Sequence, residues 1–93
     1  MNKARRKAIS KILSEIEGLD INDKFEDLRS ELETIKDEEE EAYNNLPESM
    51  QNGDKGEAMQ AAIDSLDNAI QALSDIDEAL TTLTGSLDEA VSN

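Results

Sequence analysis

The stretch Leu46–Gly56 constrains the fold of this chain more than any other segment. It contains the only proline and two of the four glycines, and long helical patterns flank it on both sides. Because proline disfavours the helical conformation in the preceding residue and lacks a backbone N–H, the first arm is expected to end by residue 45 or 46. Asn-Gly-Asp is typical of a turn, and Asn52 or Asp54 is expected to cap the next helix. The stretch therefore predicts a helical hairpin with a turn over residues 46–54.

The arm after the turn carries a regular apolar pattern. Its apolar residues alternate spacings of three and four, which is the heptad pattern of a helix that packs against another helix. The pattern predicts a helix over residues 55–83. Gly85 is expected to end or bend this helix, and Ser86 to cap a short last turn within a tail at 84–93. We call the following residues the second seam: Met59, Ala62, Leu66, Ala69, Leu73, Ile76, Leu80 and Leu83.

The arm before the turn has the same pattern and predicts a helix over residues 22–45. One acidic residue, Glu39, interrupts the pattern and belongs to the run of five consecutive acids Asp37–Glu41. Consecutive carboxylates on a helix point around the whole cylinder, so the run is not expected to converge on one metal ion. We call the following residues the first seam: Ile21, Phe25, Leu28, Leu32, Ile35, Glu39, Ala42 and Leu46.

The N-terminal segment 2–17 is predicted to be a separate amphipathic helix. Its apolar stripe loses phase at Gly18–Asp23, where a kink or a short turn is expected, with Asp20 or Asn22 capping a new helix. The chain thus predicts an arm of two helices, or one kinked helix, before the hairpin turn. The stripe consists of Ala8, Ile9, Ile12, Leu13 and Ile16.

These elements predict an all-α fold, an elongated antiparallel helical hairpin forming one domain over residues 1–93. With Phe25 and Tyr43 as the only aromatic residues, the core must consist of Ile, Leu, Met and Ala and is thin. A lone hairpin leaves half of each seam exposed, so the first helix folds back into a three-helix bundle or the chain dimerises into a four-helix bundle. We favour a homodimer, because apolar residues continue to both ends of the arms. The residues expected to mediate self-association are Leu28, Leu32, Ile35, Leu66, Leu73, Ile76 and Leu80.

The composition argues against an enzyme. The chain has no cysteine and no histidine, which excludes disulfides, thiolate zinc sites, Cys or Ser–His nucleophiles and the Glu-x-x-His di-metal pattern. Carboxylates are abundant, but acid–base catalysis needs a desolvated pocket that two or three thin helices do not provide. The segment Asp20–Asp23 lacks the glycine and distal glutamate of a calcium-binding loop. We expect no catalytic residues, no metal site and no cofactor.

The charge points to a protein partner. The net charge is −14, yet the first fourteen residues carry five basic and no acidic side chains: Lys3, Arg5, Arg6, Lys7 and Lys11. This basic start either pairs with acids elsewhere in the fold or contacts a nucleic-acid or lipid phosphate. The rest of the chain repels nucleic acid and anionic membranes, so its expected partner is a basic protein. No apolar run is long enough for a membrane span or a signal peptide, and a soluble protein is expected.

The density of acids on long helices suggests how such a partner is bound. Carboxylates at i, i+3, i+4 and i+7 repeat about every 5–6 Å along one face, a spacing comparable with that of phosphates along a duplex. Such a helix can occupy a surface meant for DNA. The same acids also keep a thin coiled coil soluble and direct helix pairing, which is the alternative interpretation. The candidate phosphate surrogates are Glu38, Glu39, Glu40, Glu41, Asp64, Asp67, Asp75, Asp77 and Glu78.

The centre of the chain resembles a family of small acidic helical proteins of phages and prophages of Gram-positive bacteria. The resemblance rests on an acidic run followed by Tyr43, Leu46–Ser49 and Gly56–Glu57, and the basic start is also similar. The segment Gly18–Asp23 looks like an insertion relative to the family pattern. The family has no established activity.

The resemblance implies a phage protein acting in the cytoplasm of a bacterial host. Small acidic phage proteins without enzymatic activity are often inhibitors of host nucleases or defence complexes. DNA mimicry is therefore the leading functional hypothesis. The alternative is a helical assembly or structural accessory that recognises another phage protein, or itself, through the apolar seams.

Overall fold

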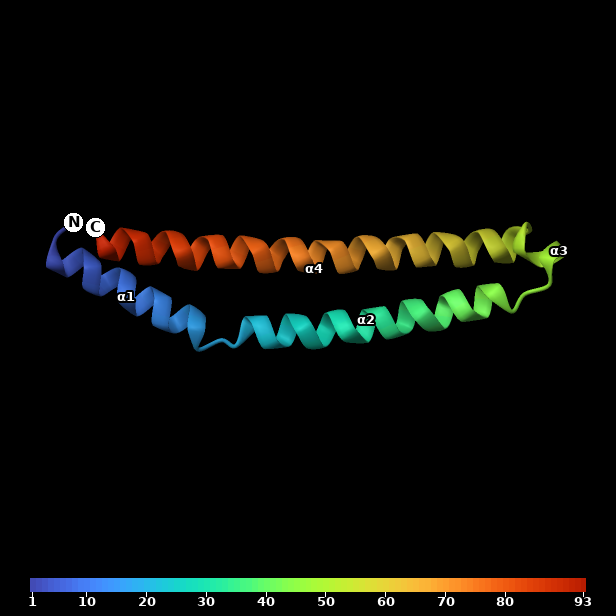
Figure 1. Cartoon of the computed structure of the whole chain (residues 1–93), viewed down its shortest axis with the longest axis horizontal. Coiled ribbons are helices and arrows are strands. Elements are labelled where there is room, and N and C mark those ends of the chain that lie inside the picture. Colours follow the sequence, from blue (N-terminus) through green and yellow to red (C-terminus); the bar gives the residue numbers. More distant parts are fainter.

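The computed structural model describes all residues from Met1 to Asn93 and contains four helices and no strand. They are α1 (Lys3–Glu17), α2 (Ile21–Asn44), the single-turn α3 (Glu48–Gln51) and α4 (Asp54–Ser92). The long helix α4 runs back along α2 and α1, so both termini lie at one end of the molecule and the turn at the other (Figure 1). The predicted all-α elongated hairpin is confirmed. The alternative of a three-helix bundle is not adopted, because α1 continues the line of α2 along α4.

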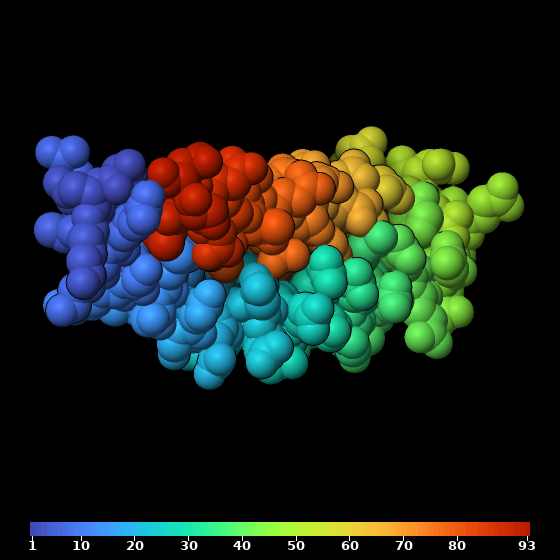
Figure 2. Space-filling view, turned by 60° about the vertical axis from the view of Figure 1, so that its left-hand side comes forward, coloured from blue at the N-terminus to red at the C-terminus, as the bar shows by residue number.

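The molecule is a thin rod. Its extents are 69 × 17 × 14 Å and its radius of gyration is 20.8 Å, whereas a compact domain of this length has a radius of about 12 Å. Only Leu13, Gly56 and Ile63 are buried. Figure 2 shows the arms in contact side by side along the rod. The fold is therefore held by one line of contacts between two arms and has no enclosed core.

The N-terminal arm is broken at residues 18–20, as predicted. The amides of Gly18 and Leu19 still donate to carbonyls of the last turn of α1, and Asp20 then takes a left-handed conformation with φ of 51°. This reversal of the backbone twist starts α2 in a new direction. The predicted cap is wrong: Asp20 lies at the N-cap position, but its side chain makes no capping hydrogen bond, and Asn22 lies inside the helix.

The turn between the arms is more ordered than the sequence predicts. Residues 48–51 form the single-turn α3, whose first carbonyl, that of Pro47, accepts from the amides of Met50 and Gln51 at 2.8 and 3.1 Å. The side-chain amide of Gln51 donates to the carbonyls of Tyr43 and Leu46 at 3.1 and 3.3 Å. One side chain therefore connects the turn to the carbonyl of Tyr43 in the last turn of α2 and to that of Leu46 just after it.

The start of α4 depends on close packing and not on a side-chain cap. The N-cap residue is Gly53, so the prediction that Asn52 or Asp54 caps this helix is wrong. In its first turn, Gly56 is buried against the backbone of Gln51, and a Cβ at this position would overlap the carbonyl group of Gln51. Only glycine lets α3 and α4 approach this closely.

The predicted end of the second arm is also wrong. Helix α4 continues through Gly85 to Ser92, residues 84–93 form no separate tail, and Ser86 lies inside the helix. A glycine in a helix interior costs only about 1 kcal/mol relative to alanine. Leu87 and Val91 remain half-buried in the part of α4 that packs against α1. Packing on α1 thus outweighs the helix-breaking tendency of one glycine.

The structure divides each predicted seam into two sets. One set lies half-buried between the arms and includes Phe25 and Leu32 of α2 and Leu66, Leu73 and Leu80 of α4. The residues three positions further on face solvent, and their exposed fractions are 47% for Leu28, 49% for Ile35, 49% for Ile76 and 46% for Leu83. The other half of the contact comes from residues four positions after each half-buried one: Arg29, Lys36 and Tyr43 of α2, and Ile63, Ile70 and Asp77 of α4.

Candidate functional site

A line of exposed carboxylates runs along α4. Its members are separated by 3, 7, 8 or 11 residues, which are sums of the helical spacings three and four and place them on one side of the helix. All are exposed, and the line covers about 48 Å of helix at 1.5 Å per residue. Two glutamines on the same line donate to the carboxylates of Asp64 and Asp75, at 3.4 and 3.1 Å. The line consists of Glu57, Asp64, Asp67, Asp75, Glu78 and Glu89.

Helix α2 adds acids to the same side of the rod, three of them close in sequence to Lys36. Around the axis of α2, Glu33, Asp37 and Glu40 are turned in one sense away from the half-buried residues of that helix. The acids of the α4 line are turned in the same sense away from the half-buried residues of α4. Because α2 and α4 are antiparallel, equal rotations place both sets on one face of the pair. The ammonium group of Lys36 bridges the two helices there, 2.7 Å from Asp67 Oδ1 and 3.7 Å from Glu40 Oε1. We call these three residues and the α4 line the acidic face.

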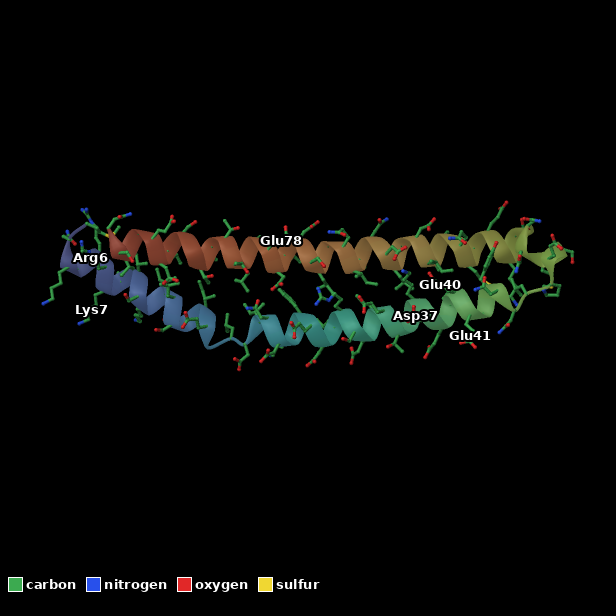
Figure 3. All side chains as sticks on the ribbon, in the orientation of Figure 1. Arg6, Lys7, Asp37, Glu40, Glu41 and Glu78 are labelled. Carbon is green, nitrogen blue, oxygen red and sulfur yellow. The ribbon has the colours of Figure 1, made fainter.

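Only part of the predicted acidic set lies on this face. It includes Asp64, Asp67, Asp75, Glu78 and Glu40. By contrast, Asp77 is half-buried beside Arg29 and Phe25 of α2, where the three residues line one small cavity. Glu39 is half-buried between the arms, and Glu38 and Glu41 are exposed on the outer side of α2, as Figure 3 shows for Glu41.

The sequence interpretation missed several members of the acidic face: Glu33, Asp37, Glu57 and Glu89. Their i, i+3, i+4 spacing relative to the chosen acids was the signal that could have identified them. It was outweighed by the more conspicuous run of consecutive acids at 37–41, whose side chains the helix spreads around its circumference.

Lys36 is the only basic side chain on the acidic face. The hydrogen bond to Asp67 raises the pKa of Lys36 above its ordinary value of 10.5, and the negative charges of Asp67, Glu40 and Asp37 act in the same direction. Partial desolvation acts in the opposite direction and is the smaller effect overall. The cation is therefore held between carboxylates of both arms and is not free to bind a partner.

The Lys36–Asp67 pair is expected to stabilise the fold up to high pH. Because the pKa of Lys36 is raised in the folded chain, its contribution is fully present below pH 10.5 and is lost as the pH rises through the higher folded value. The difference in urea midpoint between the natural chain and Asp67→Asn should therefore be constant from pH 7 to pH 10 and decrease as the pH rises above 10.5. The control is Asp64→Asn, which breaks no ion pair. A difference that stays open at pH 12 would contradict this assignment.

The basic start of α1 forms no ion pair within the chain. The ion pairs of the molecule are those of Lys36 alone, so the interpretation that the basic residues pair with acids of the same fold is wrong. Arg6 Nη2 donates to the carbonyl of Asn93 at 3.0 Å and joins the two termini. Figure 3 shows Arg6 and Lys7 at this end of the rod, while Asp37, Glu40 and Glu41 lie toward the turn. The rod thus has a basic end and an acidic end.

The side of the rod that turns away from the acidic face is apolar. In each arm the exposed apolar residues lie three positions after half-buried ones, for example Ile12 after Ile9 and Ile76 after Leu73. This rotation has the opposite sense to that of the acids, so it places these residues on the other face of the antiparallel pair. We call this set the apolar face: Ile12, Leu28, Ile35 and Ala42 of the first arm, and Ala62, Ala69, Ile76 and Leu83 of α4.

The hollows of the rod are shallow. A cleft of about 240 Å³ lies where α1 and α2 meet beside α4, and Ile16, Asp20, Ile21, Leu80 and Thr84 are among its lining residues. No group of three or more acidic side chains is arranged to hold a metal ion. No helix combines the length and apolar character needed to cross a membrane.

Comparison with protein-family models, curated proteins and solved structures gives no match to this chain. Function is therefore inferred from the two faces and the two ends of the rod.

Proposed function

We propose that this protein is a non-enzymatic binding module whose acidic face occupies a basic, nucleic-acid-binding surface of another protein. The observation that supports this proposal is the acidic face, along which the single cation, Lys36, is already paired with Asp67 and Glu40. A partner with a basic groove would meet carboxylates, side-chain amides and hydroxyl groups, but no cation, along about 48 Å of α4.

The charge density of the rod is comparable with that of a nucleic-acid strand. A net charge of −14 over 69 Å gives one negative charge per about 5 Å, against one per about 3.4 Å along one DNA strand. Guanidinium and ammonium groups bind carboxylates with the same charge-assisted hydrogen bonds that they form with phosphates. The rod would therefore exclude DNA from the groove by occupying it, which is inhibition by DNA mimicry.

The resemblance to small acidic phage proteins suggests the class of partner. We propose a nuclease or another DNA-binding defence protein in the cytoplasm of a Gram-positive host. Such a protein has the basic groove that the acidic face requires, and blocking it would benefit a phage. No enzymatic step and no cofactor are part of this mechanism.

The proposal is tested by capture from a Gram-positive bacterial lysate on the immobilised chain, followed by elution with duplex DNA and then with high salt. A DNA-binding protein released by the duplex is the expected result, because duplex and acidic face would compete for one groove. A resin carrying the chain with Asp64→Asn, Asp75→Asn and Glu78→Gln is the control and should retain little of it. If the duplex releases nothing, or both resins retain the same proteins, the mimicry proposal fails.

A second candidate function is a helical assembly accessory that acts through its apolar surface. The exposure of Leu28, Ile35 and Ile76, each close to half of the side chain, favours it. In that case Leu28→Glu should abolish binding to the phage partner, and neutralisation of the acidic face should leave binding intact. Circular dichroism must show that the helices of the variant persist.

A further inference from the structure

We propose that the apolar face is the interface of a homodimer in which two rods lie face to face with their turns at opposite ends. The partner at this face is thus a second copy of the chain. The acidic face lies on the other side of each rod and would stay exposed in the dimer. The inference therefore stands or fails independently of the binding partner of the acidic face.

The first argument is the amount of exposed surface. The accessible surface of the chain is 6775 Å², whereas a folded monomer of 10.2 kDa is expected to expose about 5,300 Å². The excess of about 1,500 Å² exceeds the roughly 800 Å² that each partner buries in a standard protein interface. A second copy on one face of the rod would remove an area of this size.

The second argument is that the central part of that face is apolar in both arms. The apolar residues recur every seven positions in α4, from Ala62 to Leu83, and the first arm contributes Leu28, Ile35 and Ala42 at the same spacing. The heptad spacing keeps each row in one line along the pair, as in four-helix bundles. Five large apolar side chains, those of Ile12, Leu28, Ile35, Ile76 and Leu83, would pass from water into a helix–helix contact, which is favourable.

The third argument is the gradient of side-chain size. Near the turn the apolar face carries alanines, Ala42, Ala62 and Ala69, whereas toward the termini it carries Leu83 and Ile12. If two copies lie with their turns at opposite ends, the small side chains of one copy face the large side chains of the other. Alternation of small and large side chains across an interface allows close packing. In such a twofold-symmetric pair the same surface of each copy forms the interface, so association stops at the dimer.

The fourth argument is the polarity of charge along the rod. The five basic residues at the terminal end form no ion pair within the chain, while the acidic run 37–41 lies toward the turn. With the turns at opposite ends, the basic end of one copy lies beside the acidic end of the other. With both turns at one end, the two acidic runs would face each other, which costs free energy. The charge distribution and the side-chain sizes therefore both favour the dimer with the two turns at opposite ends.

Sedimentation equilibrium tests the dimer directly. At 50 µM chain we expect a mass of twice 10.2 kDa for the natural sequence and 10.2 kDa for Ile76→Glu. Ile76 is 49% exposed, so this substitution removes little contact within one chain. The matched control is Gln71→Glu, which adds the same charge on the acidic side of the same helix and should remain dimeric. Leu28→Glu provides a second variant, and circular dichroism verifies that each variant is helical.

A label at the turn tests the orientation. Because the chain has no cysteine, the single variant Asn52→Cys can carry one spin label per copy. Turns at opposite ends give a label-to-label distance near the 69 Å length of the rod. Turns at one end give about 20–30 Å, since neighbouring helices lie 8–10 Å apart. The long distance supports the proposed dimer, and the short one overturns its orientation.

The dependence on salt concentration distinguishes dimer formation from partner binding through the acidic face. The dimer is held by apolar contact and should keep its mass in 0.5 M NaCl, whereas binding of a basic partner through exposed carboxylates should weaken steeply. A monomeric mass at 50 µM, or an Ile76→Glu variant that remains dimeric, would overturn the inference. Neither result would affect the test of the acidic face.

Discussion

Gly56→Ala is expected to lower the free energy of unfolding by about 1–3 kcal/mol, the typical range for forced overpacking at a buried site. The added methyl group would overlap the carbonyl of Gln51, which is backbone and cannot rotate away. To relieve the overlap, α3 must move away from α4. Gln51 would then lose its hydrogen bonds to Tyr43 and Leu46, and the turn would lose its connection to α2. Urea unfolding followed by circular dichroism measures the change.

Gly85→Ala is the matched control, because it makes the same chemical change in the same helix. A Cβ at Gly85 meets no atom within 4 Å, so the substitution should raise the free energy of unfolding by about 0.5–1 kcal/mol through helix propensity alone. Opposite signs for the two variants are the expected result. If Gly56→Ala is also neutral or stabilising, the close contact between α3 and α4 is not required for the fold.

The second large effect is expected from neutralising the acidic face. The triple variant Asp64→Asn, Asp75→Asn and Glu78→Gln should bind the captured partner at least about 100-fold more weakly, if each lost charge-assisted hydrogen bond contributes about 1–3 kcal/mol. It should also reduce the dependence of the binding constant on salt, because fewer charges are paired in the complex. Isothermal titration calorimetry at several NaCl concentrations gives both quantities.

The control for this experiment removes the same charge from another part of the surface. Glu15→Gln, Glu31→Gln and Glu38→Gln change three exposed acids that lie outside the acidic face. If affinity depends on the position of the carboxylates, this variant should bind within a few-fold of the natural chain. Equal losses for both triple variants would show that only net charge matters, and the specific acidic face would lose its support.

The fold was largely predictable from local patterns. Pro47 marks the end of the first arm, and the heptad spacing marks the two arms, because both signals act within one helix. The errors lie where distant contacts decide the outcome. Leu87 lies seven residues after Leu80 and continues the heptad spacing, but only the packing of this part of α4 on α1 decides that the helix continues through Gly85. Likewise, the need for glycine at position 56 follows from the fold of Gln51 beside it and not from its own surroundings in the sequence.

The candidate site was predictable in kind but not in detail. Net charge indicates an acidic surface, but successive residues of a helix differ by about 100° in direction. Glu78 therefore faces solvent on the acidic side, while its neighbour Asp77 lies against α2. The seam residues were divided for the same reason: spacing identifies two rows, and only the rotation of α2 against α4 decides that Leu32 is covered and Ile35 is not.

The shared position of the two termini determines how the molecule comes apart. Contacts between the arms join residues close in sequence near the turn and residues almost the full chain apart at the termini, as in the Arg6–Asn93 hydrogen bond. Closing a longer loop costs more chain entropy. Contacts between the termini are therefore favourable only after the contacts nearer the turn have formed and shortened the loop. We therefore expect the contacts between the arms to form first next to α3 and last at α1. In the folded protein, α1 is the segment that opens first, and its amides exchange with solvent before those next to the turn.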